Sequence, residues 1–136
     1  MSEAHGDRDR WMQRGYEMFD RIYGKGSSEI MAGAKGAFID ETVGHLFGEI
    51  WSRPHLSLRD RRLLILGATA ALGRKDLVEI QMRGALANGE FSDAELDEAA
   101  LMLAFYVGWG NGSATWQGIA DAQKAHAEGT PQRMGT

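Results

Sequence analysis

Apolar residues recur at helical spacing along nearly the whole chain, and no stretch alternates for long enough to predict a strand. The first predicted helix carries an apolar face made of Met12, Tyr16, Phe19 and Tyr23. A glycine-rich connection over residues 24–36 follows it. A second predicted helix buries Ile39, Val43, Leu46 and Ile50. It ends near Trp51, because Pro54 disfavours helix in the residue before it.

The third predicted helix begins at Ser57 and is apolar on all sides over residues 63–72. A helix of this kind must be covered all round, so we expect it at the centre of the domain or of an oligomer. A fourth helix is predicted from about residue 75 to 87, and Asn88-Gly89 supplies the residue pair that commonly closes a helix.

Ser92 and Glu95 predict a capping box at the start of the fifth helix, which carries Leu96, Ala99, Ala100, Leu103 and Val107. The glycine-rich segment 108–112 predicts a break before a sixth helix over about residues 113–126. The pattern therefore predicts an all-α domain of about six helices.

Length and composition narrow the class of protein. The chain has 136 residues, so we expect one domain over residues 1–136. Its net charge of −4 argues against a nucleic-acid partner. The longest apolar stretch is too short to span a bilayer and the first ten residues lack the apolar part of a signal peptide, so we expect no membrane partner and a cytoplasmic protein. Without cysteine, disulfides, thiol nucleophiles and thiol redox chemistry are excluded.

Three side chains around the end of the second helix are candidate proton-transfer groups. His45 and Glu49 are four residues apart and share one helix face, opposite the apolar residues. They could transfer protons or bind a metal, but no third ligand is near, so we expect no metal, and a solvated surface pair is the alternative. His55 stands in a turn beside Pro54 and could reach the mouth of a pocket.

Four arginines, Arg53, Arg59, Arg61 and Arg62, gather where the second and third helices meet. Positive charge is unfavourable at a helix N-terminus, so the cluster requires a partner. The partner could be Asp60, another subunit or an anionic ligand. On the fourth helix Gln81 lies on or beside the apolar face, where a buried amide must be hydrogen-bonded. It could tie two helices together or bind substrate.

The segment Gly48-Glu49-Ile50-Trp51-Ser52-Arg53-Pro54 is followed by Leu72-Gly73-Arg74, Arg83, Asn88-Gly89 and Tyr106-Val107-Gly108. Together these residues resemble the γ-carboxymuconolactone decarboxylase family over about residues 38–120. The resemblance implies the helical fold shared with alkylhydroperoxidase D. It also implies a homotrimer or homohexamer around a central helical hairpin, formed here by the third and fourth helices.

The chain departs from this family at several positions that carry chemistry. The cysteine pair of the peroxidase branch matches Arg74 and Leu77, so thiol peroxidase activity is excluded. Two histidines of the decarboxylase branch are replaced by Gln81 and Met102, and an asparagine by Ser113. Imidazoles are the side chains best suited to proton transfer near neutral pH, so the identity of the proton donor is open.

The resemblance implies a cofactor-free lyase that removes carbon dioxide from a small carboxylated lactone or aromatic-derived acid. Arg53, Arg74 and Arg83 would bind carboxylates, Trp51 and Trp109 would form an apolar wall, and Gln81 would contact substrate. Glu49, His45 and His55 are the candidate proton donors. Two alternatives stay open: a non-catalytic homologue with a binding or structural role, and an isomerase or cyclase that uses the same pocket.

Overall fold

The computed structural model describes residues 2–131 of the chain. Its elements are α1 (Ser2–Tyr23), the 3-10 helix η1 (Ser27–Met31), α2 (Ala37–Asp40), the π-helix η2 (Glu41–Ile50), α3 (Leu58–Ala71), α4 (Lys75–Ala87), α5 (Asp93–Val107) and α6 (Trp109–Glu128). No strand occurs in this range. The prediction of an all-α fold with six α-helices, as in alkylhydroperoxidase D-like domains, is confirmed.

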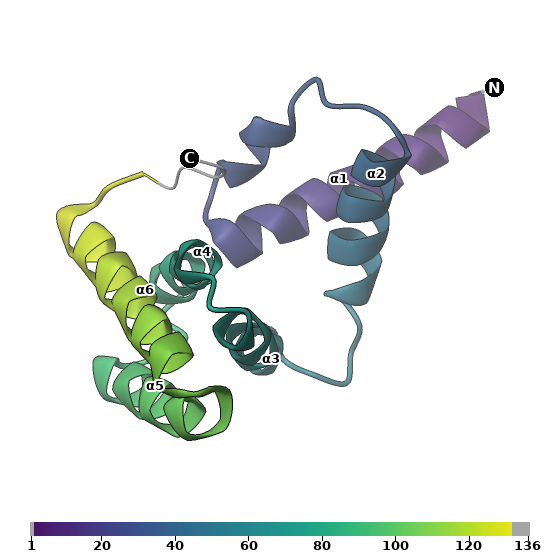
Figure 1. The fold of residues 1–136 in the computed structure, drawn as a ribbon. Helices are drawn as coiled ribbons and strands as arrows, with labels where there is room; N and C mark the ends of the chain where they lie inside the picture. The colour runs from purple at the N-terminus through teal and green to yellow at the C-terminus, as the bar shows by residue number, and fades with distance from the viewer. Residues whose placement is uncertain (1, 132–136) are drawn as a thin grey trace.

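The helices form two groups on either side of α3 and α4 (Figure 1). On one side α1 packs against η2, and Phe19, Ile22, Phe47 and Trp51 form a buried cluster. On the other side α5 and α6 enclose a second buried cluster with α3 and α4, centred on Leu66, Val78 and Met82. Within the described range, none of the helices is long and apolar enough to cross a membrane.

The segment predicted as an ordinary second helix winds instead as the short helix α2 followed by η2. A π-helix pairs residues five apart, so it turns each side chain away from its α-helical position. Val43, Gly44, Phe47 and Gly48 are buried, whereas Leu46 and Ile50 are 41% and 37% exposed. The prediction that Leu46 and Ile50 belong to the buried face is therefore wrong.

The apolar third helix is only half covered within one chain. Arg62, Leu66, Thr69 and Ala70 are buried, but Leu64 and Leu72 are 63% and 70% exposed. Apolar side chains are exposed on α5 as well, at Met102, Phe105 and Tyr106. Full burial inside the domain is thus excluded, and the alternative, a place at the centre of a homotrimer or homohexamer, stays a prediction.

The break between α5 and α6 is shorter than its glycines indicate. Gly108 alone interrupts the helices, with a φ of 92° that favours glycine, and Trp109 is already the first residue of α6. The predicted start near residue 113 is therefore four residues late. The predicted capping box at Ser92 and Glu95 is confirmed. The sharp turn at Gly108 brings the first turn of α6 against the end of α5, where the candidate site lies.

Candidate functional site

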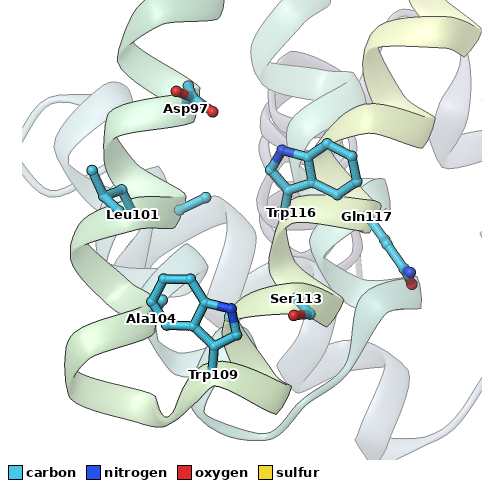
Figure 2. Close-up of a pocket in the computed structure, with 9 residues that line it drawn as sticks. Asp97, Leu101, Ala104, Trp109, Ser113, Trp116 and Gln117 are labelled. Atoms are coloured by element: carbon cyan, nitrogen blue, oxygen red, sulfur yellow. The ribbon is translucent and has the colours of Figure 1, made fainter.

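A pocket of about 390 Å³ lies between α5 and α6 (Figure 2). Its walls include Asp97, Leu101 and Ala104 from α5 and Trp109, Ser113 and Trp116 from α6. The volume lies within the range of pockets that hold small organic molecules. Its wall is mostly apolar, as expected of a site for such molecules.

Two indole rings give the pocket its apolar character. Trp109 and Trp116 are 64% and 56% exposed, and Figure 2 shows Trp116 on the α6 side of the pocket and the Trp109 ring at its end, beside Ala104 of α5. Phe105 supports Trp109 through an edge-to-face contact with a distance of 5.7 Å between ring centroids. A flat ligand that covers such exposed indole rings removes their apolar surface from water, which favours binding. The arrangement suits a small planar molecule.

The polar groups of the pocket are few. Ser113 and Gln117 supply uncharged hydrogen-bonding groups, and Asp97 is the one ionisable side chain that lines it. Of the residues predicted from sequence, Trp109 lines this pocket, as does Ser113, the position where the family's asparagine is replaced. Trp116 and Asp97 were missed. The three-residue spacing from Ser113 to Trp116 is a signal that could have found Trp116, since such residues share a helix face.

The predicted pair His45 and Glu49 lies elsewhere, on the exposed side of η2. His45 Nδ1 is 3.3 Å from Glu49 Oε1, and both side chains are about half exposed. Trp11 of α1 donates its indole N–H to the same carboxylate oxygen at 2.7 Å. The indole reaches it because it packs against Gly44, where a Cβ would lie 2.4 Å from the ring. Trp11 is 38 residues from Glu49, so no local sequence pattern indicates this contact.

The hydrogen bond from Trp11, followed by that from His45, lowers the pKa of Glu49. We expect Trp11→Phe to raise this pKa toward its ordinary value, because phenylalanine keeps the ring and removes the donor. A carbon-detected NMR titration of the Glu49 carboxyl measures the change, with Trp116→Phe as the matched control. A folded-state pKa below the unfolded value stabilises the protein at neutral pH, and this contribution is lost as pH falls through the folded pKa. An unchanged titration in Trp11→Phe would contradict the assignment.

Three of the four clustered arginines bind partners other than Asp60 within the chain, although Nε of Arg61 is buried without a hydrogen bond in the described structure. Arg59 donates to Glu95 at 2.6 Å and Arg61 to the carbonyl oxygen of Arg53 at 2.7 Å. Arg62 turns inward and binds Glu90. The side chains of Arg53 and His55 are exposed in the loop between η2 and α3. Neither lines the pocket between α5 and α6.

Gln81 belongs to a buried polar network instead of the pocket. Its Oε1 accepts from Arg62 Nη1 at 3.0 Å, and its Nε2 donates to the Tyr23 hydroxyl at 3.1 Å. The amide therefore ties α4 to α3 and α1, which is one of its two predicted roles. Burial raises the pKa of Tyr23, while Arg62 and the bond from Gln81 act in the opposite direction. No lining residue of the pocket takes part in this network.

The other predicted substrate residues are also dispersed. Trp51 is buried in the cluster of α1 and η2. Arg74 is half exposed and binds both oxygens of Asp76, at 2.9 and 2.7 Å, which lowers the pKa of Asp76 to about 2. Arg83 donates to the carbonyl oxygens of Thr130 and Pro131. The structure thus brings Arg53, Arg74 and Arg83 neither together nor to Trp109.

Within the described part of the chain, no group of three or more histidine or acidic side chains is arranged to hold a metal ion. His45 and Glu49 form a hydrogen-bonded group with Trp11. The pocket itself presents two indoles, an amide, a hydroxyl group and the carboxyl group of Asp97.

Comparison with known proteins gives two findings. Residues 37–120 match the model of the carboxymuconolactone decarboxylase family. The 4-carboxymuconolactone decarboxylase of Acinetobacter baylyi is 39% identical over 62 residues, which make up 46% of this chain and 46% of that protein. The similarity thus spans about half the length of the curated relative. The whole α5–α6 pocket falls inside the segment that the family model matches.

Proposed function

Because the chain belongs to the carboxymuconolactone decarboxylase family, we propose that it is a cofactor-free carbon–carbon lyase acting on a small carboxylated lactone or aromatic-derived acid. The family match confirms the resemblance first indicated by the segment 48–54. One observation carries the proposal: the family-matched segment contains a pocket of about 390 Å³ walled by Trp109 and Trp116. A lactone ring with its carboxylate is a molecule of suitable size and flatness for such a pocket.

The walls of the pocket would favour loss of carbon dioxide by excluding water. A carboxylate placed against the two indoles loses part of its hydration, which raises its free energy relative to the neutral product carbon dioxide. The electron pair left behind spreads into the unsaturated ring and its carbonyl oxygen. Ser113 and Gln117 are the uncharged donors available to hydrogen-bond that oxygen as its charge grows.

The carboxylate-binding roles of Arg53, Arg74 and Arg83 stay predictions, since none of them lines the pocket within one chain. Arg53 differs from the other two in one respect. Its guanidinium stands in the exposed loop 52–57, whereas Arg74 and Arg83 already bind Asp76 and backbone carbonyl groups. In the proposed homotrimer or homohexamer, Arg53 is therefore the cation with the greatest freedom to reach the pocket of another copy.

The proposal is tested with 4-carboxymuconolactone and the full chain. We expect the ultraviolet absorbance of the lactone to fall with release of one equivalent of carbon dioxide, without added metal or cofactor. Trp109→Ala should lower kcat/KM by about 10-fold or more, because it removes a wall that positions the ring. Phe38→Ala is the matched control, since Phe38 is 82% exposed and lies outside the pocket.

Two outcomes would contradict the proposal. If the protein binds the lactone and releases a rearranged product that still carries the carboxylate, this result would support the isomerase or cyclase alternative. If the protein neither binds nor consumes the lactone, a different ligand and a non-catalytic role become the better hypothesis. An equal loss of activity in Phe38→Ala would show that Trp109→Ala acts through the fold and not through the pocket.

A further inference from the structure

We infer that Asp97 is the proton donor of the pocket, and that it takes up a proton when a carboxylate ligand binds beside it. The inference rests on the proposed function, because it supplies the proton that replaces the lost carbon dioxide. It assigns this role to a residue that neither the sequence pattern nor the resemblance indicated.

The position of Asp97 supports the assignment. It stands on α5, and Figure 2 shows its carboxyl group at one end of the pocket, with Trp109 at the other. Within the described residues, the carboxylate of Asp97 forms no hydrogen bond or ion pair with another side chain. Its neighbour Asp93, one turn earlier on α5, is engaged by Gln123 of α6 at 2.8 Å. Asp97 is therefore free to approach a ligand.

The groups around Asp97 offer no competing source of protons. From α6 the pocket receives Ser113, Trp116 and Gln117, none of which releases a proton near neutral pH. On α5 the nearest charged groups are Asp93 and Glu98, both acidic. The predicted donors His45, Glu49 and His55 do not line this pocket. Among the residues that line the pocket within one chain, Asp97 is the side chain that can exchange a proton.

A bound carboxylate would convert Asp97 into an acid. A ligand that fills the space between the indoles displaces water from the side of the pocket where Asp97 stands. Its carboxylate and that of Asp97 then repel each other, so the pair takes up one proton and shares it. When the ligand's carbon–carbon bond breaks, its electron pair passes into the ring and carbon dioxide leaves. The proton of Asp97 then forms the new carbon–hydrogen bond, and solvent reprotonates Asp97. The reaction balances as one carboxylate and one proton giving one carbon dioxide and one carbon–hydrogen bond.

Asp97→Asn separates catalysis from binding. Asparagine keeps the shape of the side chain but donates no acidic proton, so we expect kcat on 4-carboxymuconolactone to fall by about 10²- to 10⁴-fold. Because the like charge is also removed, KM should stay equal or decrease. Glu98→Gln is the matched control: it makes the same chemical change on the next residue, which does not line the pocket. Wild-type kcat in Asp97→Asn would overturn the inference and leave the proposed function standing.

Proton uptake is measured independently of turnover. Calorimetric titration with 5-oxotetrahydrofuran-2-carboxylate, a saturated lactone acid, in two buffers of different ionisation enthalpy counts the protons taken up per ligand bound. We expect close to one proton for wild type and for Glu98→Gln, and none for Asp97→Asn. Absence of uptake or of binding in wild type would overturn the inference. So would preferential binding of a small aromatic amine that is lost in Asp97→Asn, because the carboxylate would then hold a cation.

Discussion

Replacing Arg62 by methionine is expected to lower the free energy of unfolding by about 3–5 kcal/mol. The Arg62 side chain is fully buried and forms two bonds with Glu90, from Nε at 3.1 Å and from Nη2 at 2.9 Å. Methionine fills much of the volume but leaves the Glu90 carboxylate, itself 8% exposed, without its cation. Gln81 loses a donor as well. Urea denaturation followed by circular dichroism measures the loss.

The double variant Arg62→Met/Glu90→Gln should recover part of this stability, because no buried charge is then left unpaired. Lys75→Met is the control, since its ion pair with Asp121 is about half exposed and surface pairs contribute little. If Arg62→Met lowers the free energy of unfolding no more than Lys75→Met does, the buried pair of Arg62 and Glu90 does not stabilise the fold more than a surface pair.

Gly84→Ala is expected to destabilise the protein by about 3 kcal/mol or more. A Cβ at this position of α4 would lie 1.9 Å from the carbonyl oxygen of Ile22 in α1. The obstacle is backbone, not a flexible side chain, so the two helices must move apart to admit one methyl group. That movement would also disturb the bond between Gln81 and the Tyr23 hydroxyl. Thermal unfolding should show a clearly lower midpoint.

The matched control for this substitution is Gly110→Ala in the first turn of α6. A Cβ there would meet no atom within 4 Å, so we expect little change in the midpoint. A comparable drop in both variants would mean that alanine is disfavoured for a reason other than the close approach of α1 and α4.

The helices could be predicted from sequence because the signals that define them are local. The span of α4 and the capping box of α5 follow from residues within one or two turns of each other. The winding of η2 could not be predicted, since its buried residues Val43, Gly44, Phe47 and Gly48 depend on contact with α1. Periodicity alone cannot distinguish five-residue from four-residue pairing in a ten-residue segment.

The candidate site was harder to predict than the fold. Trp109 was predicted as an apolar wall of the pocket, but Asp97, twelve residues earlier and on a different helix, was not predicted. Arginines of the same cluster differ in burial: Arg62 is buried, whereas Arg53 is exposed. Which arginine faces inward is decided by where Glu90 lies, 28 residues further along the chain. Such distant pairings carry no local signal.

The contact between α1 and α4 has a consequence for the order of events during synthesis. Ile22 is made 62 residues before Gly84, its close neighbour in the folded protein. At roughly 5–20 residues per second, the ribosome needs about 3–12 s to produce that interval. During this time the apolar side of α1, with Phe19 and Ile22, has no α4 to cover it. The first helix of the nascent chain therefore completes its packing only after more than half of the protein has been translated.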